Sequence, residues 1–292
     1  GNPPIAEFKG WRQEGAIYNP LGDGLGFVPD QTTIESGVYF RFGTATGIPR
    51  QLLNEAAGNV QTPINILGTT TEAVSSFMVG ALRFDLTQQV QPQFDLVSND
   101  RVGTLLTQTY VVTNTAAAGT AAIDFELVRY LDGDLNFDGL DGLGGTTSNS
   151  TGILQNGVPD GASDDGGGRL FNRITGDEFL FETEQGGVSS NGTFIGITSK
   201  PNPALPPAAF PANRFELSLF PALRNQIRNG DALKNQIAND ANSDGSVDPG
   251  QEGNVTLALR NTYSLLPGAS AVYTTHTIFG NGRPDQIQFN RG

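Results

Sequence analysis

The feature that most constrains this chain is an alternation of apolar and polar side chains that recurs from one end to the other. In one segment Ile123, Phe125 and Leu127 alternate with Asp124 and Glu126. Because successive side chains of a strand point to opposite faces, this alternation predicts strands with one buried face. Gly, Pro, Asn and Asp bound these segments, so the sequence predicts an all-β chain folded as an antiparallel β-sandwich. The other expected strands are 38–42, 77–86 (with a bulge at Gly80), 106–112, 179–183, 194–198, 215–219, 255–259 and 272–279.

One stretch departs from this pattern. Residues 221–240 read PALRNQIRNGDALKNQIAND, with apolar residues four apart at Leu223 and Ile227 and again at Leu233 and Ile237. That spacing places each pair on one side of a helix, and Gly230 fits a helix end. The sequence therefore predicts one or two short helices near 221–239.

The order of these segments suggests how the chain is organised. We predict a β-sandwich over residues 1–200 with a long acidic loop at 131–168. Residues 212–292 then carry the helical insert, a calcium loop and the closing strands of the same or a second sandwich, and a single domain remains open. Residues 83–86 (RFDL) are similar to 214–217 (RFEL), and each is followed by a strand with a Thr-Tyr pair. This indicates either two related halves or the ordinary likeness of antiparallel strands.

The composition of the chain argues against some classes of function. Asp and Glu number 30 against 17 Lys and Arg, which gives a net charge of −13. A nucleic-acid-binding protein needs a cationic face, so no nucleic-acid partner is expected. No apolar run approaches the ~18 residues of a transmembrane helix, so no membrane insertion is expected. The chain has no cysteine and starts GNPPIAEF, which we interpret as a mature or trimmed exported chain.

The sharpest chemical signal is DANSDGSVD at residues 240–248. Oxygen-bearing side chains fall at loop positions 1, 3 and 5, and Gly245 at position 6 permits a sharp turn, the arrangement in which alternate residues converge on Ca²⁺. This segment resembles the calcium loops of EF-hands and dockerin modules. It departs from them at position 12, where Gln251 replaces the bidentate acid. The alternative is a solvated turn. The predicted ligands are Asp240, Asn242, Asp244, Ser246 through its carbonyl, Asp248 and Glu252.

A second acidic segment, DGDLNFDGLD, begins directly after the expected strand that ends at Tyr130. So many carboxylates in one turn repel one another unless a cation lies among them; two charges 4 Å apart cost ~1 kcal/mol even in water. The alternative is a flexible acidic loop. The candidate ligands for a further Ca²⁺ are Asp132, Asp134, Asn136, Asp138 and Asp141.

Two longer segments carry a resemblance to known proteins. Residues 106–128 (LTQTYVVTNTAAAGTAAIDFELV) resemble the Ig-like repeat of bacterial cell-surface proteins, in which a YxVTNT strand precedes a small-residue turn and another strand. The runs VRYLDGDLNFDG, DGGGRLF and EFLFETE are similar to segments of exported proteins of Gram-negative bacteria. The resemblance implies an Ig-like or jelly-roll-like module at the cell surface or outside the cell, and supplies no catalytic residue.

Catalytic residues find little support in the sequence. His276, the only histidine, lies in an alternating segment and is expected to be a strand residue. No cysteine, GxSxG motif or phosphate-binding loop is present. Glycoside hydrolysis needs only two carboxylates, and Glu178 and Glu182 are available, although the alternation places Glu182 on the outward face. We therefore do not expect this chain to be an enzyme.

Two functions remain open. The favoured one is an extracellular or cell-surface structural protein, stabilised by Ca²⁺, that assembles into a homo-oligomer, filament or surface layer through strand and edge contacts. Residues 1–10 and 285–290 are candidate partner strands. The alternative is a secreted calcium-dependent protein that binds a polysaccharide or acts on glycans.

Overall fold

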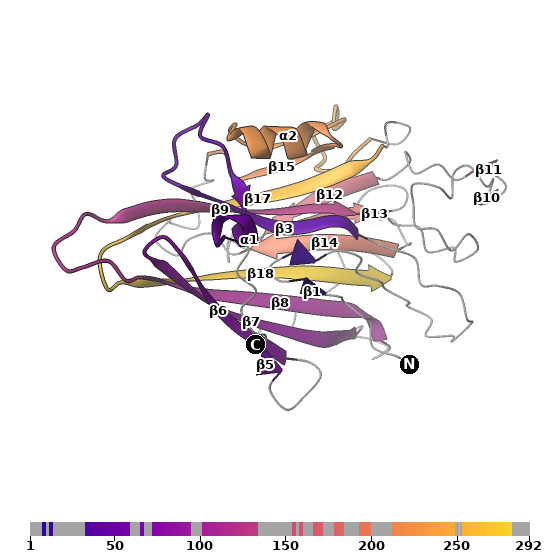
Figure 1. Ribbon diagram of the computed structural model, residues 1–292. Helices are drawn as coiled ribbons and strands as arrows, with labels where there is room; N and C mark the ends of the chain where they lie inside the picture. Colours follow the sequence, from indigo (N-terminus) through magenta and orange to yellow (C-terminus); the bar gives the residue numbers. More distant parts are fainter. Residues whose placement is uncertain are drawn as a thin grey trace.

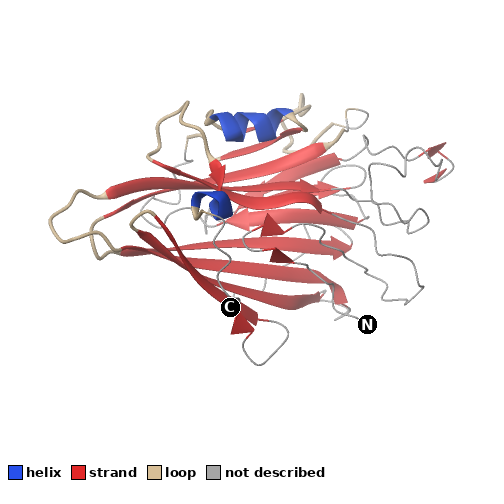
Figure 2. Ribbon diagram, viewed as in Figure 1, coloured by secondary structure: helices blue, strands red, loops and turns tan. Residues whose placement is uncertain are grey.

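The computed structural model describes residues 8–9, 12–13, 33–58, 65–66, 72–94, 101–133, 154–155, 158–159, 166–171, 178–183, 193–199, 212–248, 251 and 253–281. Within these residues the chain is an all-β sandwich of two packed sheets with two short helices, as the alternation predicts (Figures 1 and 2). Neither helix is long and apolar enough to cross a membrane.

Sheet A lies beneath helix α2 (Ala222–Asn229) in Figure 1. Its neighbouring strands are antiparallel except for one parallel pair, β15 with β16. In spatial order they are β1 (Phe8–Lys9), β2 (Arg12–Gln13), β3 (Thr33–Phe42), β9 (Ile123–Gly133), β17 (Val255–Leu265), β15 (Phe215–Leu219) and β16 (Gln236–Ile237), with β4 (Gln51–Leu52) beside β3 and followed by helix α1 (Leu53–Ala56).

Sheet B forms the other layer and is antiparallel throughout its described strands. In spatial order these are β12 (Gly166–Phe171), β13 (Glu178–Thr183), β14 (Thr193–Ser199), β18 (Ser270–Asn281), β8 (Arg101–Asn114), β7 (Leu82–Phe94), β6 (Glu72–Val79) and β5 (Asn65–Ile66). A separate two-stranded ribbon contains β10 (Leu154–Gln155) and β11 (Val158–Pro159).

The inner faces of the two sheets bury two apolar clusters with a polar layer between them. Along β9, Leu127 belongs to the first cluster and Leu131 to the second, with the buried Arg129 between them. Along β17, buried Asn261 lies in the same way between the two clusters. Apolar burial at about 25 cal/mol per Å² supplies the main drive for packing the sheets, and the polar layer must find hydrogen bonds inside it.

The strand order repeats with the sheets exchanged. Strands β18, β8 and β7 lie side by side in sheet B, and β9, β17 and β15 lie in the matching order in sheet A. The chain path β7, β8, β9 therefore recurs as β15, β17, β18, the topological counterpart of the RFDL and RFEL similarity. Helix α2 and residues 240–248 lie between β15 and β17, so they interrupt the second path. Strands of 212–292 hydrogen-bond directly to strands of 1–200.

Of the one or two helices expected near 221–239, one forms. Helix α2 ends at Gly230, which has φ +83° and a Cβ position only 1.9 Å from the carbonyl oxygen of Ile48, so only glycine fits there. The second expected helix is absent because Asn235 has φ +53° and turns the chain. Its amide oxygen accepts the backbone N–H of Phe215 at 3.0 Å, which directs the next residues into β16 beside β15.

Two further expectations are wrong. Gly80, with φ +56°, is in a tight turn between β6 and β7 rather than in a bulge. Glu182 points inward: it is fully buried, and its carboxylate lies where a Cβ on Gly133 would be. The phenylalanines of β13 are buried as expected, in a cluster that excludes the inward Leu180, so both faces of β13 are covered and only the outward placement of Glu182 is wrong.

Candidate functional site

The segment Asp240–Asp248, here called the 240–248 loop, joins the two sheets. It follows β16 at the end of sheet A and reaches β12, the end strand of sheet B. The N–H of Arg169 donates to the carbonyl of Gly245 at 2.8 Å, and the N–H of Val247 donates to the carbonyl of Gly167 at 2.8 Å. Ser246 and Gly168 form the antiparallel bridge between these bonds. Val247 is 3% exposed and belongs to the second core cluster, so the loop is anchored on both sides.

Side chains of the loop fold back on its own backbone. The Asp240 carboxylate accepts the N–H groups of Asp244 at 3.0 Å and Gly245 at 3.1 Å. The Asn242 amide oxygen accepts the same N–H of Asp244 at 2.8 Å, and the Asp244 carboxylate accepts the N–H of Ser246 at 2.9 Å. Oxygens from loop positions 1 and 3 therefore meet at one backbone nitrogen. The turn needs left-handed backbone at Ser243 (φ +60°) and Gly245 (φ +91°).

The donor set fits a hard cation at positions 1, 3 and 5. Asp240, Asn242 and Asp244 offer carboxylate and amide oxygens, the ligands that Ca²⁺ takes. Asp248 has one carboxylate oxygen engaged by the N–H of Ala241 at 2.8 Å, and the carbonyl of Gln251 accepts from Asn239 at 2.7 Å. Glu252 lies outside the described residues. Among the residues that the structure describes, no group of three or more His, Cys, Asp or Glu side chains has the arrangement of a metal site. A Ca²⁺ ion in this loop would therefore need amide and backbone oxygens as ligands as well as the carboxylates.

The second acidic segment is described only at its start. Asp132 is a strand residue near the end of β9, 2% exposed and paired with Thr256 and Glu35 on the adjacent strands. The other candidates of this segment lie outside the described residues: Asp134, Asn136, Asp138 and Asp141.

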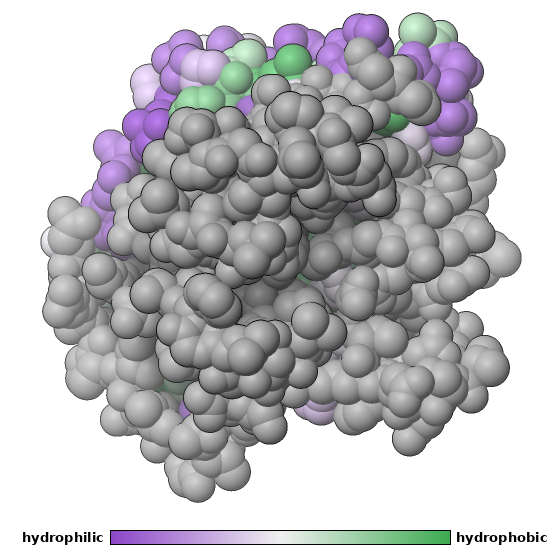
Figure 3. All heavy atoms as spheres, turned by 90° about the vertical axis from the view of Figure 1, so that its right-hand side faces the viewer, coloured by the Kyte–Doolittle hydropathy of each residue, from purple (hydrophilic) through white to green (hydrophobic). Residues whose placement is uncertain are grey.

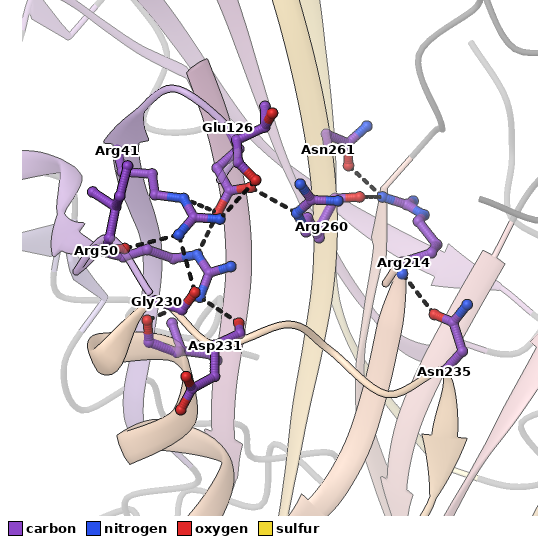
Figure 4. A network of polar contacts seen from close by, with 12 residues as sticks. Arg41, Arg50, Glu126, Arg214, Gly230, Asp231, Asn235, Arg260 and Asn261 are labelled. Carbon is purple, nitrogen blue, oxygen red and sulfur yellow. Dashed lines mark hydrogen bonds and ion pairs between the residues drawn. The ribbon is translucent and has the colours of Figure 1, made fainter. Parts of the chain in front are cut away.

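A buried ion network on the outer face of sheet A was not predicted from the sequence (Figure 4). Glu126 of β9 is fully buried and forms ion pairs with three guanidinium groups: Arg41 at 2.7 Å, Arg50 at 2.5 Å and Arg260 at 2.7 Å. Burial lowers the pKa of Arg50 because the charged form loses its hydration. One negatively charged carboxylate therefore faces three positively charged arginines, and other groups must compensate the excess positive charge.

Backbone carbonyls at the end of α2 meet that charge. Arg50 donates to the carbonyls of Ile227 at 3.0 Å and Asp231 at 2.9 Å, and Arg41 donates to that of Gly230 at 3.0 Å. The carboxyl end of a helix carries a partial negative charge, so these bonds hold α2 against the sheet. The signal available in the sequence was the nearly continuous apolar run Val38-Tyr39-Phe40, which is typical of a strand covered on both faces, whereas Arg41 alone would indicate a solvated face.

A second ion cluster holds the other side of α2. Glu35 is 2% exposed and pairs with Arg224 of α2 at 2.7 Å. It also accepts the hydroxyl of Tyr39 at 2.5 Å, and Arg228 donates to the same hydroxyl at 3.2 Å. Burial, with a further contribution from Glu35, raises the pKa of Tyr39 to about 12. Helix α2 is therefore fixed by charges at both sides of its apolar contact.

Arg129 occupies the polar layer between the sheets and is 1% exposed. Its guanidinium donates to the carbonyls of Gly37 at 3.0 Å and Tyr130 at 2.5 Å, and to the hydroxyls of Ser36 at 2.5 Å and Thr277 at 2.8 Å. Within the described part of the chain no carboxylate pairs with it, and burial lowers its pKa. Because Thr277 belongs to sheet B, Arg129 ties the sheets together from inside.

The remaining chemical candidates are strand residues. His276 lies in β18, where its Nδ1 and the Thr198 hydroxyl are 2.6 Å apart. Glu178 of β13 bridges Arg169 at 2.7 Å and Arg214 at 2.9 Å, which joins sheet B to the Arg214 end of β15. Seen from the right-hand side of Figure 1, the described surface lies mainly along the upper and upper-left edge, where most residues are hydrophilic and hydrophobic ones are scattered among them (Figure 3).

Comparison with known proteins places the chain in no family. No family model and no curated protein matches it. Solved structures with some likeness include a protein described as a kojibiose phosphorylase from the human microbiome, at 9% identity and TM-score 0.31 over 91% of this chain and 26% of that one. Another is a polysaccharide lyase, at 10% identity and TM-score 0.38 over 93% of this chain and 29% of that one. The chain spans less than a third of either, and scores this low carry no argument about function.

Proposed function

We propose that this chain is an extracellular or cell-surface structural protein whose β-sandwich is stiffened by Ca²⁺ in the 240–248 loop. In this proposal copies assemble into a homo-oligomer, filament or surface layer through sheet edges. Residues 1–10 and 285–290, the partner strands expected from sequence, lie outside the described strands except for Phe8–Lys9 of β1.

The observation that supports this proposal is the position of the loop. It begins at the end of sheet A, buries Val247 in the core and bonds to β12 of sheet B through Arg169 and Gly167. An ion held by Asp240, Asn242 and Asp244 would order this connection and restrain both sheets at once. It would also offset repulsion among carboxylates in a chain of net charge −13.

Thermal unfolding tests the calcium part. A ligand that binds only the folded state at one hundred times its dissociation constant stabilises it by about 2.7 kcal/mol. For a chain of this size that raises the melting temperature by about 5–10 °C. The Asp244→Ala variant should lose most of this response, whereas Asp124→Ala, which removes an exposed carboxylate at the start of β9, should keep it. A melting temperature that is the same in Ca²⁺ and in chelator would overturn the calcium assignment.

Light scattering and electron microscopy test the assembly part. Purified chain at neutral pH should form discrete oligomers or filaments rather than monomers alone. Removal of residues 1–10 should reduce their size, because an extended segment would no longer add to a neighbouring sheet. Monomers at every concentration would contradict the structural role.

One observation favours the alternative, a secreted calcium-dependent carbohydrate-binding protein or glycan-acting enzyme. Glu35 and Asp132 are paired across β3 and β9, and glycoside hydrolysis uses two neighbouring carboxylates. Each residue is only 2% exposed, however, and Glu35 is held by Arg224. A glycan array with and without chelator separates the two functions, since glycan retention that depends on Ca²⁺ would favour the alternative.

A further inference from the structure

Arg129 carries a positive charge in the interior of the sandwich. The residue is 1% exposed, and its guanidinium bonds to two carbonyl and two hydroxyl groups, none of which is an anion. Within the described part of the chain no carboxylate lies against it. A guanidinium keeps its proton in proteins, and arginine is almost never fully buried without a partner charge because its desolvation is costly. The described side chains therefore leave this charge without a negative partner.

One donor of the Arg129 side chain is also left over. The two terminal nitrogens make all four hydrogen bonds, whereas Nε is buried and has no hydrogen-bond partner. The buried hydroxyls of Tyr110 and Tyr273 likewise lack a hydrogen bond of normal geometry. Each of these three groups can donate a proton. Buried polar groups in a native fold are satisfied by protein, by ordered water or by an ion, so the three donors indicate a bound acceptor.

The two tyrosines face Arg129 from sheet B. They are direct partners on β18 and β8, and their ring centres are 5.7 Å apart. Burial raises the pKa of both hydroxyls, and the positive charge of Arg129 acts on each in the opposite direction. Thr277, which accepts from Arg129 at 2.8 Å, lies four residues after Tyr273 on the same face of β18. The guanidinium and the two hydroxyls are therefore within electrostatic reach of one another.

We propose that Arg129, Tyr110 and Tyr273 bind one small monovalent anion, of the halide class, enclosed between the two sheets. The anion accepts the Nε–H and the two hydroxyls, so it satisfies three donors and compensates the guanidinium at once. A water molecule could accept from these donors but would leave the charge uncompensated in the interior, where charge interactions are strong. Neither Ca²⁺ in the 240–248 loop nor assembly of copies is needed for this site.

The burial of the site limits the size of the anion. Arg129, Tyr110 and Tyr273 are each at most 1% exposed, so the ion has no substituent that reaches solvent. Chloride and bromide meet this condition, whereas gluconate, a polyhydroxylated carboxylate, does not. The comparison of these salts therefore separates binding in the interior from the general effect of salt on surface charges.

Thermal unfolding in chelator, which keeps Ca²⁺ away, tests the site. A ligand that binds only the folded state adds stability with each tenfold rise above its dissociation constant, and for a chain of this size that raises the melting temperature by about 3–5 °C. The wild type should show this rise as NaCl replaces sodium gluconate at constant ionic strength, which holds screening constant. The same melting temperature in both salts would overturn the proposal.

Two matched arginine variants show where the anion acts. Arg129→Met removes the buried charge and keeps an apolar stem, so its melting temperature should be the same in gluconate and in chloride. Arg83→Met removes an exposed guanidinium that pairs with Asp85, and it should respond to chloride as the wild type does. A response that persists in Arg129→Met, or that both variants lose equally, would contradict the assignment.

Tyr110→Phe keeps the test decisive if Arg129→Met does not fold. It removes one hydroxyl and no charge, and the loss of a hydrogen bond to the anion should raise the chloride concentration of half-maximal response about tenfold. An unchanged half-maximal concentration would contradict the role of this hydroxyl and with it the three-donor site.

Crystals grown in NaBr locate the ion directly. Anomalous scattering at the bromine absorption edge should give a peak beside Arg129 Nε and the hydroxyls of Tyr110 and Tyr273. Bromide found only on the outer surface, or a water without anomalous signal at this position, would overturn the site. A wild-type melting temperature unaffected by Ca²⁺ would instead overturn the calcium assignment and leave these outcomes in force.

Discussion

The backbone N–H of Arg169 donates to the carbonyl of Gly245 at 2.8 Å, and this bond joins the end strand of one sheet to a loop that leaves the other. The loop side chains Asp240, Asn242 and Asp244 all accept bonds from the loop backbone within a few residues of Gly245. A change in the order of the loop is therefore transmitted to both sheets.

Replacement of Glu126 by Gln should destabilise the protein strongly. The amide cannot neutralise Arg41, Arg50 and Arg260, and a buried charge left without its partner typically costs about 3–5 kcal/mol. Urea unfolding should show this as a lower midpoint, with α2 losing its helical signal early because Arg50 holds its end.

The matched control is Asp124→Asn, two residues earlier on the same strand but exposed. It should change the midpoint little, since exposed charges contribute up to about 1 kcal/mol. Equal losses for the two variants would show that Glu126 does not organise the arginines.

Asp124 and Glu126 also show which part of the fold the sequence could predict and which part it could not. The alternation in β9 correctly separated Phe125 and Leu127 from their polar neighbours, and it placed Asp124 in solvent as observed. It could not indicate that Glu126 is buried, because its partners at 41, 50 and 260 are far away in the sequence. A local pattern reports which residues share a face, whereas the covering of that face depends on α2 and other distant segments.

Alkaline pH should unfold the protein as its tyrosines ionise. Burial raises the pKa of Tyr39 to about 12 and also raises those of Tyr110, Tyr130, Tyr263 and Tyr273. Since the folded pKa exceeds the unfolded value of about 10, this stabilisation is complete below pH 10 and is lost as the pH rises through the folded value.

Absorbance at 295 nm against pH measures this directly. These five residues should stay protonated at pH 10 and ionise together with the loss of circular dichroism above about pH 11. Five tyrosines that titrate near pH 10 in a folded chain would contradict their burial.

Asn114→Ala should weaken the turns that connect the sheets. Asn114 is fully buried, donates to the carbonyl of Leu265 at 2.8 Å and accepts the N–H of Ala116 at 2.9 Å. The substitution leaves a buried carbonyl without its donor, at a cost of about 1–3 kcal/mol. Chemical unfolding should register this loss, while Ser264→Ala, an exposed residue beside Leu265, should change stability by less than about 0.5 kcal/mol.

The local turn of the 240–248 loop could be predicted from the sequence, while its calcium ligands stay a prediction. The DANSDG spacing located a turn in which Asp240 and Asn242 meet at one nitrogen, since that geometry is local. The contact of the loop with β12 was not predicted, because it depends on strand order across both sheets. The second expected helix does not form for a related reason. The backbone N–H of Phe215 in β15 donates to the Asn235 amide oxygen, and this bond outweighs the helical spacing of Leu233 and Ile237.

Anomalous diffraction from crystals grown in millimolar CaCl₂ tests the central claim most directly. We expect one calcium peak in the 240–248 loop, within about 2.3–2.6 Å of oxygens from Asp240, Asn242 and Asp244. The same loop with water at that position, and no anomalous peak, would contradict it.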